Sequence, residues 1–206
     1  MRPPRLLLIL ALAIAAPFAS ASAPAVATEQ VAPVTAADRS IGRADAPVTV
    51  IEYASFACHH CADWHQFVYP VFKSRLIDTG QVRLVFRNLP TEPLQMSVPA
   101  AALARCAVPD RFFDVTAALM HGQRAVLNGG TLDAWYVPAI AASGRTRAQI
   151  DACTTTPATR AAIERDIDSA RASDVDQTPS FFVNGRRVMD PSLGGLEVAI
   201  RAAAAR

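Results

Sequence analysis

Residues 50–61, Val-Ile-Glu-Tyr-Ala-Ser-Phe-Ala-Cys-His-His-Cys, decide the fold of this chain. The apolar, β-branched run at 48–53 predicts a buried strand, and two cysteines follow it closely. Apolar residues then recur at helical spacing, namely Trp64, Phe67, Val68, Val71 and Phe72. Pro70 inside this pattern predicts a kink. A Cys-x-x-Cys motif therefore lies where a strand gives way to a helix.

The segments further along the chain complete an α/β pattern. A second strand is predicted at 82–86, so that strand, helix and strand form a βαβ unit. Helical patterns follow over 98–108, 111–127, 132–142, 147–153 and 158–172. Strands return at 180–183 and 186–188 around Asn184-Gly185, a strong hairpin signal, and a last helix is predicted at 193–205.

The N-terminus has the layout of a secretory signal peptide. Arg2 and Arg5 precede the apolar run 6–16, and small residues follow at 19–21. Cleavage is expected after Ala21, because Pro24 would follow a cut after the second candidate site. The apolar run is shorter than the roughly 20 residues of a membrane-spanning helix, although an uncleaved anchor is the alternative. Residues 22–40 are interpreted as a mobile leader.

Length and charge limit the class of protein. The chain has 206 residues, 51% of them hydrophobic, which suits one domain or one domain with an insertion. It carries 20 basic and 18 acidic side chains, and both excess positive charges lie in the predicted signal peptide. This balance argues against nucleic acid or an anionic membrane as a partner. Export favours disulfide chemistry for the four cysteines.

The position of Cys58 predicts a reactive sulfur. The first N–H groups of a helix lack partners within the helix and favour negative charge, so the pKa of Cys58 is expected to fall. His59 and His60 can donate N–H bonds or positive charge to the Cys58 thiolate. Cys61 lies one turn further on, where it is more covered. A stabilised reduced form makes the disulfide a stronger oxidant.

The two cysteines also fit other kinds of site. A zinc site needs four ligands, and His65 and His121 would have to be recruited because there is no second Cys-x-x-Cys. A c-type haem needs histidine directly after the second cysteine, where Ala62 stands. A purely structural disulfide would close a short loop, which stabilises little. The zinc and structural readings stay open as alternatives.

Two distant features fit redox chemistry. Thr178-Pro179 precedes a strand, and if this bond is cis the Thr178 backbone is free to pair with an extended substrate peptide. An ordinary trans proline is the alternative. Glu52 is a carboxylate inside an apolar strand, from which it could exchange the proton of Cys61, unless its head group reaches solvent.

These motifs carry a resemblance to a known family. Residues 50–61 resemble the strand and active-site segment of DsbA-type thiol:disulfide oxidoreductases, and residues 178–185 resemble their cis-proline strand and hairpin. The resemblance implies an α/β, thioredoxin-like fold with an inserted all-helical domain. Residues 41–91 and 175–206 would form the thioredoxin-like domain, and residues 92–174 the helical insertion.

The resemblance also assigns roles to individual residues. It implies that Cys58 is the nucleophile, Cys61 the resolving cysteine, Pro179 cis and Glu52 the buried acid. His59 stands where oxidases of this family often have proline, whereas His60 fits the oxidising type. The resemblance pairs Cys106 with Cys153 in a second, structural disulfide, and two separate thiols are the alternative.

The sequence thus predicts a periplasmic thiol:disulfide oxidase that donates its Cys58–Cys61 disulfide to reduced exported proteins. By resemblance, a membrane quinone-linked protein reoxidises it. We expect no cofactor, no metal and no nucleic-acid partner, and we expect a monomer. The alternatives are a disulfide isomerase or reductase of the same fold, and a non-enzymatic zinc- or peptide-binding module.

Overall fold

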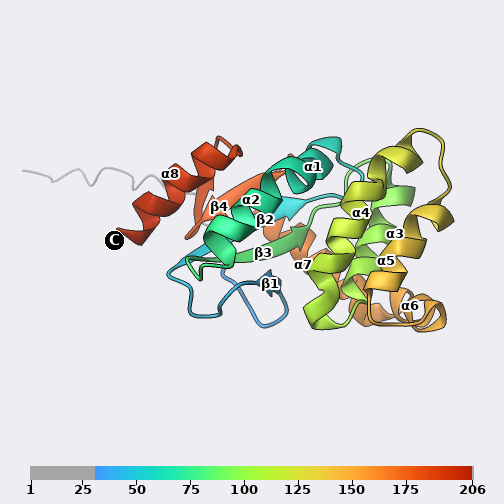
Figure 1. Cartoon of the computed structure of the whole chain (residues 1–206). Coiled ribbons are helices and arrows are strands. Elements are labelled where there is room, and N and C mark those ends of the chain that lie inside the picture. The colour runs from blue at the N-terminus through green and yellow to red at the C-terminus, as the bar shows by residue number, and fades with distance from the viewer. Residues whose placement is uncertain (1–30, 206) are drawn as a thin grey trace, which may run out of the picture.

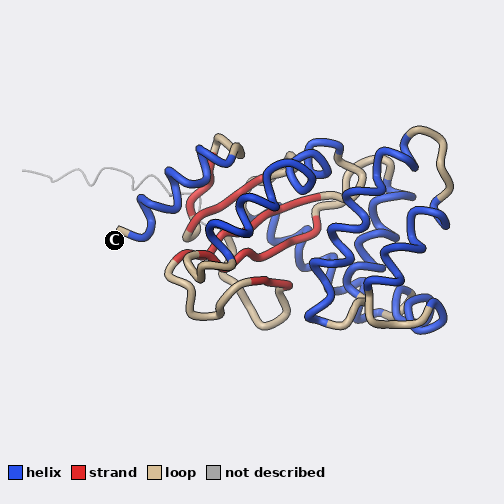
Figure 2. Tube along the Cα trace, viewed as in Figure 1, coloured by secondary structure: helices blue, strands red, loops and turns tan. Residues whose placement is uncertain are grey.

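A computed structural model describes residues 31–205 of the chain (Figure 1). The predicted signal peptide at 1–21, with its cleavage site, lies outside the described residues. The helices gather at one end of a sheet and also lie along its faces (Figure 2). The α/β class predicted from the sequence is confirmed.

A five-stranded sheet forms the centre of the α/β part of the chain. Its strands are β1 (Arg39–Ile41), β2 (Val48–Ala54), β3 (Val82–Asn88), β4 (Ser180–Val183) and β5 (Arg186–Val188). They are arranged in the order β1-β3-β2-β4-β5. Only β2 and β3 run parallel, as expected for two strands joined by a helical crossover. The central strand β2 is the one that leads to Cys58.

The crossover between β2 and β3 is a helix interrupted by wider π-helical turns. Its parts are α1 (His59–Asp63), η1 (Trp64–Val68), α2 (Tyr69–Phe72) and η2 (Lys73–Ile77). The first wide turn precedes Pro70, which has no N–H to donate to the preceding turn. The shift in register turns Phe67 outward, so that it is 64% exposed. The regular apolar stripe predicted for this helix is therefore wrong at Phe67.

Five helices lie between β3 and β4, where the sequence predicts a helical block. They are α3 (Leu94–Arg105), α4 (Phe112–Leu127), α5 (Leu132–Ala142), α6 (Arg147–Thr154) and α7 (Pro157–Ala172). A short 3-10 turn (Pro109–Arg111) precedes α4. Threonine side chains cap α5, α6 and α7 at Thr131, Thr146 and Thr156. The chain ends with α8 (Leu193–Ala204).

Helices cover both faces of the sheet. Alternating side chains of β2 point to opposite faces. Val50 belongs to the larger core, which includes Phe72 of α2 and Leu196 of α8. Ile51 belongs to a smaller core on the other face, with Ala170 of α7. The strand β2 is therefore enclosed between helices on both faces, in a three-layer arrangement of helix, sheet and helix.

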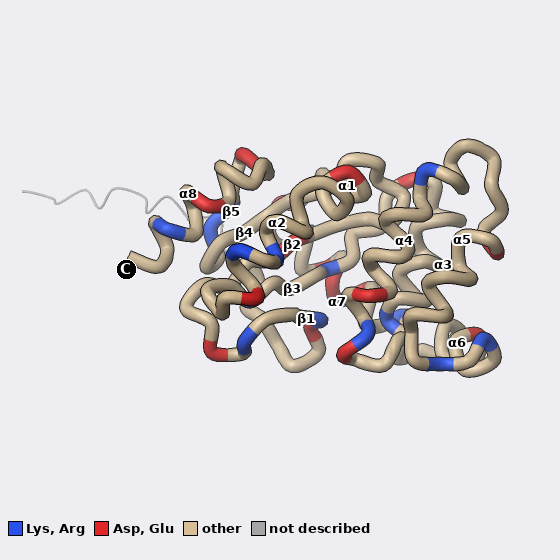
Figure 3. The backbone as a smooth tube through the Cα atoms, viewed as in Figure 1, with Lys and Arg blue, Asp and Glu red and all other residues tan. Residues whose placement is uncertain are grey.

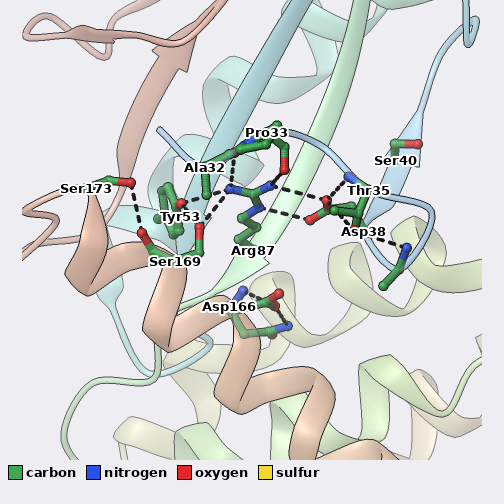
Figure 4. A network of polar contacts seen from close by, with 12 residues as sticks. Ala32, Pro33, Thr35, Asp38, Ser40, Tyr53, Arg87, Asp166, Ser169 and Ser173 are labelled. Atoms are coloured by element: carbon green, nitrogen blue, oxygen red, sulfur yellow. Dashed lines mark hydrogen bonds and ion pairs between the residues drawn. The ribbon is translucent and has the colours of Figure 1, made fainter. Parts of the chain in front are cut away.

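The leader predicted at 22–40 is wrong for residues 31–40, which are part of the fold. The Arg87 guanidinium, on β3, donates to the backbone carbonyls of Ala32 and Pro33, both at 2.9 Å, and to the Asp38 carboxylate at 2.9 Å (Figure 4). It also binds Tyr53 Oη at 3.0 Å and Ser169 Oγ at 2.8 Å. The segment leading into β1 is thus fixed by an arginine almost 50 residues away.

A disulfide joins two helices of the inserted block. Cys106 follows α3, Cys153 lies in α6, and their Cα atoms are 5.8 Å apart. The bond links residues 47 positions apart in the sequence. It therefore closes a long segment that contains all of α4 and α5.

The charged residues are interspersed along the described chain (Figure 3). Basic and acidic residues occur over both the sheet and the helical block, and several form ion pairs, as Arg147 does with Asp133 at 2.7 Å. Within residues 31–205 no helix is both long enough and apolar enough to cross a membrane.

We predict that Arg87→Met lowers the free energy of unfolding by about 3–5 kcal/mol, because it leaves the Asp38 carboxylate buried without its partner. Urea unfolding measures this loss. Arg43→Met is the matched control, since Arg43 pairs with Asp45 in solvent and should cost less than about 1 kcal/mol. Equal losses in the two variants would contradict a structural role for the Arg87 network.

Replacing both Cys106 and Cys153 by serine should lower the free energy of unfolding by about 4 kcal/mol, since the denatured chain regains the freedom of a long loop. The same urea experiment tests it, with wild type under reducing conditions as a second comparison. A double variant as stable as the oxidised wild type would show that this bond does not form in the exported protein.

Candidate active site

Cys58 lies at the point where β2 passes into α1. It is the N-cap residue of α1, with extended backbone angles and no capping hydrogen bond from its side chain. Backbone N–H groups of the first helical turn lack partners within the helix and can donate to a negatively charged sulfur. The Cys58 sulfur, which is only half-buried, is the acceptor in the right place.

The helical block holds this turn through Gln123, a buried residue of α4. Its side-chain amide donates to the carbonyl oxygens of Phe56 at 2.7 Å and Cys58 at 3.0 Å. These two contacts fix the peptide groups Phe56–Ala57 and Cys58–His59. The sequence analysis missed Gln123, because nothing in its local pattern marks it as a neighbour of the motif.

The Cys58 thiolate is stabilised by its surroundings. A hydrogen bond from the Cys61 thiol is the main cause that lowers the pKa of Cys58, to about 5. Burial opposes this effect, while Thr178 and the backbone N–H groups of Cys61 and His60 add to it. In its protonated form the Cys58 thiol donates to the backbone carbonyl of Thr178 at 3.2 Å. Cys58 is therefore charged at neutral pH and lies against the segment that precedes β4.

Cys61 has the opposite character. Its side chain is fully buried, and burial is the main cause that raises its pKa. The hydrogen bond to Cys58 and the negative charges of Cys58 and Glu52 raise it further. Two cysteines of one motif thus differ sharply: an accessible thiolate and a covered thiol.

Glu52 and His65 form a buried pair beneath the motif. The imidazole Nε2 lies 3.0 Å and 3.1 Å from the two carboxylate oxygens of Glu52. Both side chains are almost completely excluded from solvent, so the alternative in which the Glu52 head group reaches water is wrong. The sequence analysis considered His65 only as a recruited zinc ligand. Within residues 31–205 no three His, Cys, Asp or Glu side chains gather as a metal site would require.

His59 and His60 lie beside Cys58 without bonding to it through their rings. Both are exposed, and the ring centroids are 3.9 Å apart. In the described part of the chain neither imidazole makes a hydrogen bond to Cys58, and His60 acts on the sulfur through its backbone N–H. Any effect of the two imidazole rings on the Cys58 sulfur would therefore be electrostatic and would act through solvent.

A groove of about 480 Å³ runs from the motif along the segment that precedes β4. Thr178-Pro179, whose peptide bond is cis, forms one wall. Phe67 and Met189 flank the groove and are 64% and 81% exposed. Exposed large apolar side chains beside a concave surface are typical of a binding site for a polypeptide. Sequence reasoning missed both residues, because Phe67 has the spacing of a core residue and Met189 follows a hairpin.

Comparison with known proteins places the chain among thioredoxin-like proteins. A family model described as Thioredoxin matches residues 35–201. The chain is 31% identical over 172 residues to the Na(+)/H(+) antiporter NhaA 3 of Salinispora tropica, a match that covers 81% of this chain and 24% of that protein. It is 41% identical over 64 residues to the probable disulfide bond formation protein D of Bacillus cereus, covering 31% and 30% of the two chains. The chain thus spans about a quarter of the length of the first of these relatives.

Solved structures share the fold. BdbD from Bacillus subtilis superimposes with a TM-score of 0.75 at 20% identity, covering 86% of this chain and 98% of that one. Alpha-DsbA1 from Wolbachia pipientis gives a TM-score of 0.70 at 24% identity, covering 84% and 93%. The predicted thioredoxin-like fold with inserted helices is confirmed by these similarities.

The pKa of Cys58, about 5, predicts how the stability of the reduced protein depends on pH. Because the folded-state pKa lies below the ordinary value of 9.0, ionisation favours folding. The stabilisation is complete above the unfolded pKa and is lost as pH falls through the folded one. The difference in free energy of unfolding between reduced wild type and Cys58→Ser should therefore grow from pH 5 to pH 8.

Thiolate absorbance checks the same pKa directly, with Cys61→Ala as the companion variant. Because the Cys61 thiol is the main donor to Cys58, this variant should raise the pKa of Cys58. An unchanged value would assign the effect to Thr178 and the backbone N–H groups instead.

Proposed function

Because the chain belongs to the thioredoxin family, we propose that it is a thiol:disulfide oxidoreductase that oxidises exported proteins. The contrast between the two cysteines carries the proposal. Cys58 is accessible and its pKa is lowered to about 5, whereas Cys61 is buried and its pKa is raised. Thiol–disulfide exchange needs one sulfur that substrates can reach and a second one that stays covered.

The proposed reaction begins with the Cys58–Cys61 disulfide. A substrate thiolate attacks the Cys58 sulfur, the bond between the two cysteines breaks, and Cys61 leaves as a thiolate. Cys61 then takes up a proton, because its buried site disfavours negative charge. Glu52, which lies beneath the motif, is the proposed source of this proton. The product of the step is a mixed disulfide between Cys58 and the substrate.

The second step releases an oxidised substrate. A second thiolate of the substrate attacks the substrate sulfur of the mixed disulfide, and Cys58 leaves as a thiolate. A leaving group of low pKa departs quickly, which the surroundings of Cys58 favour. The substrate loses two electrons and gains a disulfide, and the protein is left with two reduced cysteines.

The direction of the reaction follows from the stability of the reduced form. Since the fold stabilises the Cys58 thiolate, it also raises the tendency of the disulfide to accept electrons. This supports an oxidase over a reductase or isomerase. His59 and His60 are proposed to tune the potential. Reoxidation is assigned to a membrane quinone-linked protein, and the predicted signal peptide would place the reaction in the periplasm.

Substrate recognition is proposed to rely on backbone and apolar contacts. The Thr178 carbonyl lies within 3.2 Å of the Cys58 sulfur, where an extended chain could pair with it. The groove with Phe67 and Met189 continues from this point and suits apolar side chains. The near-zero net charge predicted for the exported chain fits recognition without a strong electrostatic component.

A redox titration against glutathione tests the proposal. We expect a potential well above the roughly −270 mV of thioredoxin, and a value near thioredoxin's would indicate a reductase. Cys58→Ser should abolish oxidation of a reduced unfolded protein, while the double serine variant at Cys106 and Cys153 should retain it. Residual oxidation by Cys58→Ser, or stoichiometric zinc on the reduced cysteines, would contradict the proposed mechanism.

A further inference from the structure

The buried Glu52–His65 pair connects the sheet to the helix that follows the motif. Glu52 lies on the central strand β2 and His65 lies in η1, so the pair spans the layer between sheet and helix. His65 is packed among aromatic rings, at centroid distances of 5.1 Å from Trp64, 5.2 Å from Tyr69 and 6.0 Å from Phe86. Neither member of the pair is open to water.

A carboxylate in such a place depends on its partner. A buried acid without compensation takes up a proton rather than keep its charge. Within residues 31–205, His65 is the one side chain that hydrogen-bonds to Glu52, and it contacts both carboxylate oxygens. The imidazole therefore orients the carboxylate, and it is the hydrogen-bond partner that is able to carry a compensating positive charge.

The charge of Glu52 acts on two neighbouring groups. It contributes to raising the pKa of Cys61 and of Tyr69, in both of which burial is the larger cause. Cys61 lies in α1 and Tyr69 in α2, where the Tyr69 ring packs beside that of His65, while Phe86 on β3 is apolar. The charges of Asp78 and Asp114 also raise the pKa of Tyr69. In this set His65 is the only basic group.

We propose that His65 is a positioning residue for the proton of Cys61. By holding Glu52 oriented and charge-balanced, it lets the carboxylate exchange a proton with the Cys61 sulfur. The inference deepens the proposed function and rests on it. When a mixed disulfide on Cys58 is resolved, Cys61 gives its proton to Glu52 and its thiolate attacks Cys58. The bond to the substrate sulfur breaks, the substrate leaves reduced, and the two cysteines are left oxidised to a disulfide.

The test follows resolution of a mixed disulfide between Cys58 and glutathione. Release of glutathione is measured by rapid mixing from pH 5 to pH 8 in wild type, His65→Gln, Glu52→Gln and the double variant. Glutamine in place of His65 keeps a hydrogen-bond donor but cannot carry charge. His121→Gln is the matched control, because His121 is exposed on α4, away from the pair.

We expect His65→Gln to slow resolution about tenfold or more at pH 7, as loss of a positioned proton acceptor does. The double variant should be no slower than Glu52→Gln alone, and His121→Gln should match wild type. The pKa of Cys58 should stay at about 5 in His65→Gln, which general disruption of the site would not allow. A wild-type rate and pH profile in His65→Gln would overturn the inference.

Failure of the two proposals can be told apart. If wild type forms no mixed disulfide through Cys58, the proposed function itself fails. If the mixed disulfide forms but resolves independently of His65, only this inference fails. Should His65→Gln not fold, nitrogen chemical shifts of the wild-type imidazole decide: we expect a proton on Nε2 facing Glu52, and an unprotonated Nε2 would overturn the inference.

Discussion

A negatively charged sulfur at Cys58 is stable only while hydrogen-bond donors point at it, and the arrangement of the site follows from this requirement. Burial works against the charge, so the donors of Cys61, His60 and Thr178 have to outweigh it. They can do so because β2 ends in the middle of the sheet, held between β3 and β4. Because β2 is paired on both sides, the position of its last residue is fixed, and so is the start of the helix that follows.

The inserted helices share in this task. Gln123 of α4 binds two carbonyl groups of the turn that carries Cys58. On the other side of the block, Asp166 of α7 accepts from the backbone and side chain of Asn88 at the end of β3, and it also pairs with Arg105 of α3. The insertion is thus tied to the ends of both parallel strands. A change in the packing of the inserted helices would therefore displace the turn at Cys58 through Gln123.

The helices and four of the five strands could be predicted from the sequence, because apolar periodicity, Asn184-Gly185 and the Cys-x-x-Cys motif are local signals. The strand β1 was missed, because it begins in the segment predicted as a leader. The interactions that failed prediction are non-local. The segment before β1 looks like a leader until Arg87 provides its partner. Phe67 has core spacing until a wide helical turn moves it outward. The contact of His65 with Glu52 forms only when η1 packs against β2.

The two edge strands of the sheet are β1 and β5. β1 and β5 have three residues each, against seven in β2 and β3, and both run antiparallel to their neighbours. Arg186 and Arg187 add charge to the β5 edge. Short, charged outer strands offer little template for another chain. Under the proposed function, unfolded polypeptides would bind at the groove beside Cys58, and the sheet edges would not template their aggregation.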